Sequence, residues 1–173
     1  MTTCTNMEQK NKIIYAVDRL APQIKQLALT IHGHSELSFA EVDSCAALIA
    51  PLREAGFVIE EQLAGLPTAF RATFDSGKPG PTIALLAEYD ALIGLGHACG
   101  HNLIGSASVA AALALHAGFP ELSGRIEVIG TPAEEEGGGK ILLAGKGVFD
   151  GHDAVMMFHP RDKTMVTRGG LAC

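Results

Sequence analysis

Side chains that commonly bind metals or transfer protons stand just after three apolar runs of this sequence. They are Asp90, Cys99 and His101 after the run 83–87, Glu134 and Glu135 after 126–129, and His159 after 154–158. A thiolate, imidazoles and carboxylates together suit Zn²⁺ or another divalent transition ion. The glycine between Cys99 and His101 lets the backbone bend so that both side chains face one ion. A metal site is therefore predicted, provided that the three runs end at the same place.

The runs have the features of β-strands, and the segments between them have those of helices. Runs rich in strand-forming residues predict strands at 57–59, 68–74, 82–87, 125–130, 154–158 and 164–167. Helical apolar patterns predict helices at 11–31, 39–55, 103–116 and 140–147. Their alternation predicts an α/β fold in three αβα layers with a mostly parallel central sheet. In such a sheet the carboxyl ends of the strands share the edge where ligands bind, so the candidate side chains would meet there.

Local signals predict how the first two helices bend, begin and end. Pro22 predicts a kink or a break in the first helix, because proline has no N–H to donate. Ser38 with Glu41 three residues later is typical of a capping box, which would open the second helix. Gly56 would end that helix.

Each candidate ligand also has a purely structural interpretation when it is taken alone. A lone cysteine such as Cys99 is commonly a small buried hydrophobe, and a glutamate pair is commonly solvated. The meeting of all of them at one edge favours the metal site. Neighbouring side chains of an extended segment point to opposite sides, so one of Glu134 and Glu135 could bind metal while the other faces substrate. We expect structural roles for the remaining histidines of interest, which are His32, His97, His116 and His152.

Composition excludes several classes of function. The 13 Lys and Arg against 19 Asp and Glu give a net charge of −6, which argues against nucleic-acid binding through phosphate neutralisation. The four cysteines have no paired spacing, and residues 1–12 lack the apolar core of a secretion signal, so we expect a cytoplasmic protein with reduced thiols. The longest apolar stretches, such as 107–115, are shorter than the roughly 20 residues of a membrane span. We expect neither nucleic acid nor a membrane as a partner.

Four motifs carry a resemblance to a known family. They are Gly-His-Ala-Cys-Gly-His-Asn at 96–102, Gly-Thr-Pro-Ala-Glu-Glu at 130–135 with Gly-Gly-Gly-Lys at 137–140, Met-Phe-His-Pro at 157–160, and the segment 32–39. The sequence resembles the metallo-amidohydrolase and aminopeptidase-like family, which includes aminobenzoyl-glutamate hydrolase, hippurate hydrolase and the auxin-conjugate hydrolases. Ser35 stands where that family more often has proline, and Asn102 stands where it more often has aspartate. The second difference, together with Glu-Tyr-Asp-Ala-Leu at 88–92 and Pro-Ala-Glu-Glu at 132–135, makes the chain more similar to the aminobenzoyl-glutamate hydrolase and dipeptidase branch.

The resemblance implies a site with two divalent metal ions, Zn²⁺ or Mn²⁺. The implied metal ligands are Cys99, His101, Glu135 and His159. Glu134 would be the general base that takes a proton from a metal-activated water, and Asp90 would orient a ligand. The implied reaction is hydrolysis of the amide bond of an N-acyl amino acid or a dipeptide-like substrate.

Proteins that this chain resembles are longer. They insert a lid and dimerisation domain and then complete the catalytic domain, which supplies one more metal-binding histidine. We therefore expect residues 1–173 to be the N-terminal part of the catalytic domain, inactive alone, and the full-length protein to be a homodimer through its lid. Two alternatives stay open. One is a truncated, non-catalytic metal-binding or interaction module, and the other is a redox role for Cys99, which lacks a second cysteine at a useful spacing.

Overall fold

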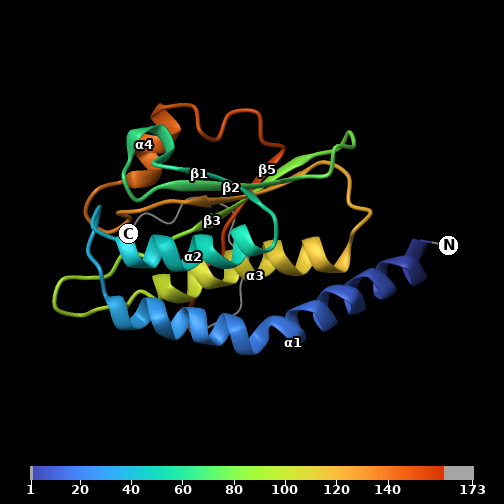
Figure 1. The fold of residues 1–173 in the computed structure, drawn as a ribbon, viewed down its shortest axis with the longest axis horizontal. Helices are drawn as coiled ribbons and strands as arrows, with labels where there is room; N and C mark the ends of the chain where they lie inside the picture. Colours follow the sequence, from blue (N-terminus) through green and yellow to red (C-terminus); the bar gives the residue numbers. More distant parts are fainter. Residues whose placement is uncertain (1, 162–173) are drawn as a thin grey trace.

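One five-stranded sheet organises the chain in the computed structural model, which describes residues 2–161 (Figure 1). The strands are β1 (Val58–Glu61), β2 (Phe70–Asp75), β3 (Thr82–Ala87), β4 (Arg125–Gly130) and β5 (Ala154–Met156), in the spatial order β1-β2-β4-β3-β5. β2 pairs antiparallel with β1 and β4, whereas β3 pairs parallel with β4 and β5. Four strands therefore share one direction and only β2 runs against them. The strand predicted over 164–167 lies outside the described residues.

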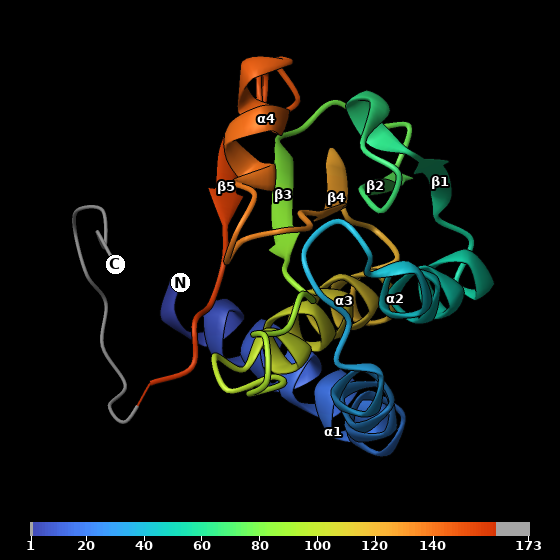
Figure 2. The same cartoon turned by 90° about the vertical axis from the view of Figure 1, so that its left-hand side faces the viewer.

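Helices cover both faces of this sheet, so the predicted α/β fold is confirmed. The helices are α1 (Thr2–His34), α2 (Val42–Glu54), α3 (His101–Gly118) and α4 (Gly139–Gly145), with a short 3-10 turn, η1, at Leu63–Gly65. Figure 2 shows α2 and α3 against one face, α1 outside α3, and α4 on the opposite face. None of the helices within residues 2–161 combines the length and apolar character needed to cross a membrane.

The core has two parts because strand side chains alternate between the faces. On β3, Ala84 and Leu86 belong to the smaller cluster with Leu143 of α4. Ala87 belongs to the larger cluster under α2 and α3. Glycine lets α3 approach the end of β3 closely, since a Cβ at Gly105 would lie 2.7 Å from the carbonyl oxygen of Glu88. The helix that begins with His101 is thus packed directly against the carboxyl edge of the sheet.

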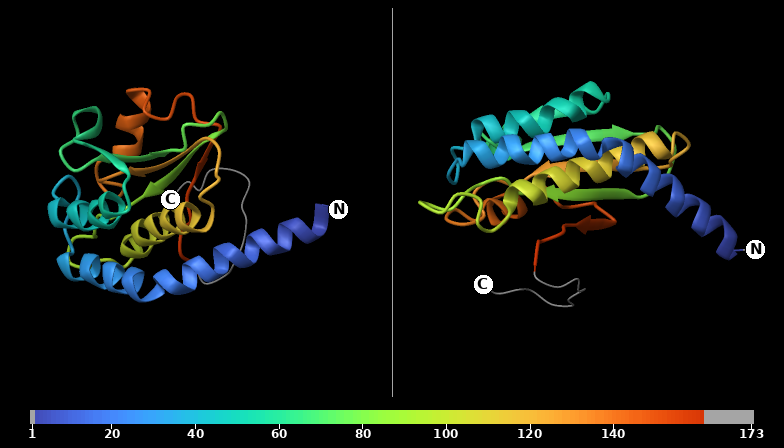
Figure 3. Two further views of the ribbon diagram at one scale, coloured as in Figure 1. Left: turned by 45° about the vertical axis from the view of Figure 1, so that its right-hand side comes forward. Right: turned by 90° about the horizontal axis from the view of Figure 1, so that it is seen from below.

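The first helix is longer than predicted. It begins at Thr2 rather than near residue 11 and continues through Pro22 to His34, so the predicted break does not occur. The ribbon of α1 bends midway along its length instead (Figure 3). Residues 7–12 of this helix are exposed and mostly polar, with a Glu8–Lys12 ion pair at 3.2 Å, and therefore carry no apolar periodicity that could reveal the helix.

The predicted capping box of α2 is wrong. Neither Ser38 nor Glu41 caps the helix, which begins at Val42 with no side-chain bond from its N-cap residue. Glu36 takes that role, because its carboxylate accepts the backbone N–H groups of Asp43 and Ser44 at 2.9 and 2.8 Å. These hydrogen bonds lower the pKa of Glu36 despite the opposing effect of its burial. Ser38 and Glu41 are thereby free to serve the site described below.

Candidate metal centre

The candidate side chains meet at the carboxyl edge of the sheet, as the sequence predicts. Glu88 and Asp90 follow β3, His101 is the first residue of α3, and the turn with Glu134 and Glu135 follows β4. His159 follows β5.

A tight turn places Cys99 next to His101. Gly100 precedes α3 with a φ of 78°, a conformation that glycine adopts without strain. A Cβ at Gly100 would lie 2.7 Å from the side chain of Pro160, so the segment that carries His159 packs on this turn.

His101 is the centre of the cluster and is 1% exposed. Its Nδ1 lies 2.9 Å from the carbonyl oxygen and 3.0 Å from the Oδ1 of Asp90. Both partners are acceptors, so Nδ1 carries a proton, and in the neutral imidazole Nε2 keeps a free lone pair. That Nε2 lies 3.4 Å from Glu88 Oε2, 3.6 Å from Glu135 Oε1 and 3.8 Å from Glu134 Oε2. One imidazole nitrogen thus faces three carboxylates.

The acidic groups around His101 shift the pKa values of several site residues. Burial disfavours the charged form of His101, but its hydrogen bond to Asp90 and the nearby carboxylates of Glu88 and Glu135 raise its pKa. Burial also opposes ionisation of Asp90, yet the hydrogen bonds from His101 and from the Glu135 N–H lower the pKa of Asp90. The interaction with the Glu135 carboxylate, followed by burial, raises the pKa of the Cys99 thiol to about 11. A bound cation would reverse the last effect, because a coordinating thiol loses its proton.

Asp90 connects three segments of the site. Besides His101, it accepts the backbone N–H of Glu135 at 3.0 Å and the hydroxyl of Ser38 at 3.1 Å, both through Oδ2. The carboxylate therefore fixes the tautomer of His101 and the position of the glutamate turn together.

The segment that carries Glu134 and Glu135 is a turn and not the extended segment that we predicted. Ala133 has a φ of 58°, so both carboxylates reach toward His101 rather than to opposite sides. The Ala133 N–H donates to Oε1 of the buried Glu41 at 2.8 Å. The Thr68 hydroxyl donates to Oε2 of the same carboxylate at 2.8 Å. Glu41 thus supports a backbone conformation that non-glycine residues rarely adopt.

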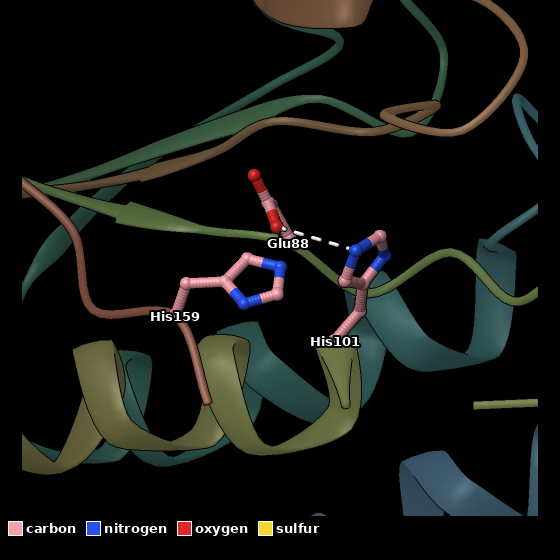
Figure 4. Close-up of side chains that lie close together, drawn as sticks. All are labelled: Glu88, His101 and His159. Carbon is pink, nitrogen blue, oxygen red and sulfur yellow. Dashed lines mark ion pairs between the residues drawn. The ribbon is translucent and has the colours of Figure 1, made fainter. Parts of the chain in front are cut away.

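Within residues 2–161, two overlapping groups of side chains offer ligand atoms within 4.8 Å of one another, and His101 belongs to both. Cys99 and Glu135 complete the first group, and Glu88 and His159 complete the second, which Figure 4 shows. Glu88 Oε2, His101 Nε2 and Glu135 Oε1 are buried without any hydrogen-bond partner. Buried polar atoms are normally paired, and these nitrogen, oxygen and sulfur donors are the ones that divalent transition ions bind. The residues present therefore fit a metal centre.

Glu88 and Lys140 are the members that the sequence analysis missed. Lys140, in the first turn of α4, binds Oε1 of Glu88, which is 1% exposed. The available signal was a carboxylate directly after the apolar run 83–87, together with the lysine that ends the motif 137–140.

The other candidate residues form hydrogen bonds with helices and strands outside the metal centre. The His97 Nε2 lies 3.1 Å from the carbonyl oxygen of Ile31 in α1, and His152 Nε2 lies 3.1 Å from Glu127 on the far face of the sheet. Asn102 donates its side-chain N–H to the carbonyl oxygen of Ala28 at 3.1 Å, which joins α3 to α1. An amide can make this hydrogen bond, whereas an ionised aspartate at the same position could not.

Comparison with solved structures shows that the fold is shared with known proteins. The aminobenzoyl-glutamate utilization protein from Klebsiella pneumoniae matches with a TM-score of 0.70 and 25% identity, over 83% of this chain and 45% of that one. A dinuclear metal-binding peptidase of family M20 from Bacillus subtilis matches with a TM-score of 0.66 and 28% identity, over 76% of this chain and 41% of that one. The fold is thus similar to the catalytic domains of metal-binding peptidases.

Sequence comparison gives the family. The model of peptidase family M20/M25/M40 matches residues 63–173, and the chain belongs to this family. The chain is 37% identical over 164 residues to one of the subunits of the p-aminobenzoyl-glutamate hydrolase of Escherichia coli (strain K12), a match that covers 84% of this chain and 34% of that protein. It is 39% identical over 164 residues to the Xaa-Arg dipeptidase of Mus musculus, covering 87% of this chain and 38% of that protein. The chain therefore spans little more than a third of the length of these relatives.

Proposed function

We propose that this chain is part of a metal-dependent hydrolase that cleaves the amide bond of N-acyl amino acids or dipeptide-like substrates, of the aminobenzoyl-glutamate or dipeptide type. The observation that carries the proposal is the convergence of unpartnered buried atoms of Glu88, His101 and Glu135 beside the Cys99 thiol. The names of the relatives support the same class of substrate, since one is an aminobenzoyl-glutamate hydrolase and the other a dipeptidase.

Four side chains would hold the metal, namely Cys99, His101, Glu135 and His159. A divalent ion bound there supplies Lewis-acid polarisation of the amide carbonyl and a lowered pKa of the attacking water. Asp90 keeps the proton of His101 on Nδ1, so that Nε2 faces the centre. Glu134, more exposed than Glu135, is free to take a proton from the water and pass it to the leaving amine.

The charges of the cluster support two divalent ions, Zn²⁺ or Mn²⁺. The Lys140 ammonium neutralises Glu88. The remaining acidic groups are Asp90, Glu134, Glu135 and Cys99 in its thiolate form. Two divalent cations would balance the four negative charges of these groups when His101 is neutral.

A nearby cation supports a substrate with a free carboxylate. Arg161 lines a depression next to Cys99, together with His97. Guanidinium groups bind carboxylates through paired hydrogen bonds, and N-acyl amino acids and dipeptides both carry a terminal carboxylate.

The domain to which the chain belongs, the oligomeric state of the full-length protein and its location are also part of the proposal. The matches cover 34% and 38% of the relatives, which supports residues 1–173 being the N-terminal part of a catalytic domain in a longer protein that also has a lid and dimerisation domain. The full-length enzyme would be a homodimer through that lid. The free thiols of Cys45 and Cys99 support a cytoplasmic location.

The test compares Glu134→Gln with the control Glu136→Gln, an exposed glutamate of the same turn. Both variants are made in the polypeptide that extends this sequence to the length of its relatives. Metal content is measured by plasma mass spectrometry and turnover with p-aminobenzoyl-glutamate and dipeptides. We expect both variants to keep their metal, and Glu134→Gln alone to lose about 10²- to 10⁴-fold in kcat, the usual contribution of a general base. Equal turnover of the two variants would reject Glu134 as the base, and metal without turnover in the parent would favour the non-catalytic module.

A further inference from the structure

We propose that Glu88 is an additional ligand of the metal centre. This inference rests on the proposed function, since it assumes that the centre binds a divalent ion, and it adds a carboxylate from the end of β3 to the ligands that the sequence motifs indicate.

The two oxygens of Glu88 have different surroundings. Lys140 holds Oε1, whereas Oε2 is buried and has no hydrogen-bond partner. Oε2 lies 3.4 Å from His101 Nε2, and when His101 is neutral no proton lies between them because Asp90 keeps the proton on Nδ1. An ion pair whose role is only structural leaves this second oxygen unexplained, because buried acceptors are normally satisfied.

The spacing of the atoms matches two ligands of one ion. Bonds from Zn²⁺ to nitrogen and oxygen are about 2.1 Å long, and in a tetrahedral site this places ligand atoms about 3.4 Å apart. The 3.4 Å from Glu88 Oε2 to His101 Nε2 agrees with that value, and the 3.6 Å from Glu135 Oε1 to the same nitrogen is close to it. His159 offers a third ligand atom within 4.8 Å of those of Glu88 and His101 (Figure 4).

Other parts of the molecule hold Glu88 in this position. It follows β3 directly, and a Cβ at Gly105 of α3 would contact its carbonyl oxygen. Lys140 enters from α4, which a close approach of Gly139 to the carbonyl of Pro132 brings against the sheet. Backbone and side chain are therefore constrained from both faces of the sheet before any ion binds, which is the preorganisation that a metal ligand needs.

The test uses Co²⁺ and Zn²⁺ with the polypeptide that extends this sequence to the length of its relatives, its variants Glu88→Gln and Glu88→Asp, and the control Glu127→Gln. Glu127 is a matched control because it is also a buried carboxylate on the sheet, paired with Arg71 and His152 away from the centre. The visible absorption of bound Co²⁺ reports the ligand set, a competing chelator gives the Kd, and circular dichroism confirms that each variant folds.

We expect Glu88→Gln to change the Co²⁺ spectrum and raise the Kd for Zn²⁺ at least tenfold, with no change in Glu127→Gln. Glu88→Asp keeps the charge, but its side chain is one methylene shorter and moves the carboxylate oxygen away from the ion. This variant should therefore also change the spectrum and raise the Kd. If Glu88→Asp has the spectrum and Kd of the parent, Glu88 acts only through its charge and the proposal is overturned. The same holds if Glu88→Gln matches the parent. A parent chain that folds but binds neither ion would overturn the metal centre itself, which distinguishes failure of the proposed function from failure of this inference.

Discussion

Removal of the Glu41 carboxylate is expected to destabilise the turn that carries the two site glutamates. Glu41 is fully buried and accepts the Thr68 hydroxyl and the Ala133 N–H, each at 2.8 Å. Glu41→Ala leaves both donors without a partner. A buried unsatisfied group costs about 1–3 kcal/mol, so the loss in the free energy of unfolding should be about 2–6 kcal/mol. Release of Ala133 from its left-handed conformation would offset part of this loss, because that conformation is strained for a non-glycine residue.

The pH dependence of the same residue has a definite sign. Burial raises the pKa of Glu41, although hydrogen bonds from Thr68 and Ala133 oppose the shift. The folded state therefore holds this proton more tightly than the unfolded chain does. Its contribution to stability is present at low pH and is lost as the pH rises through the folded-state pKa. Glu41→Gln cannot ionise, so its stability relative to the parent should increase from pH 4, which lies below the ordinary pKa of a glutamate, to pH 8.

The assay is urea-induced unfolding followed by circular dichroism at both pH values. Glu54→Gln, an exposed glutamate at the end of α2, is the control and should change the free energy of unfolding by less than about 0.5 kcal/mol. The reasoning is refuted if Glu41→Ala costs less than about 1 kcal/mol. It is also refuted if the difference between Glu41→Gln and the parent is the same at both pH values.

Two further substitutions test the packing around the site. Asn102→Asp should cost about 1–3 kcal/mol at pH 7, because an ionised carboxylate cannot donate to the carbonyl of Ala28, and urea unfolding that matches the parent would contradict this. Gly139→Ala should lower the free energy of unfolding by about 1–3 kcal/mol, since its Cβ would lie 1.9 Å from the Pro132 carbonyl oxygen. Gly145→Ala in the same helix has open space at its Cβ and should not destabilise; equal effects of the two glycine changes would exclude the close contact as the cause.

Sequence patterns located the sheet well because its central strands are short, apolar and bounded by turn residues. The limits of β3 and β4 agree with the predicted segments 82–87 and 125–130. The beginning of α1 escaped prediction because residues 7–12, which are exposed and mostly polar, show no apolar periodicity. The cap of α2 was misassigned to Ser38 and Glu41 because sequence spacing cannot show that Glu36 folds back onto the helix.

The sequence likewise predicted some contacts of the candidate site and missed others. Spacing alone brought Cys99 and His101 together, because only one residue separates them. The contact between Lys140 and Glu88 spans 52 positions, and that between Glu41 and Ala133 spans 92. Such contacts depend on how the helices pack against the sheet, which a local pattern does not contain.

The order of the segments has a consequence for folding. Glu88, Asp90, Cys99 and His101 all lie within the β3–α3–β4 crossover, and the glutamate turn follows directly after it. A cation bound by the side chains of this crossover and turn would bind the folded chain and not the unfolded one. By thermodynamic linkage, a free ion concentration 100-fold above the Kd would add about 2.7 kcal/mol to the stability of the fold. The midpoint of thermal unfolding would then depend on the ion supply, so the availability of metal would set how much of the chain is folded.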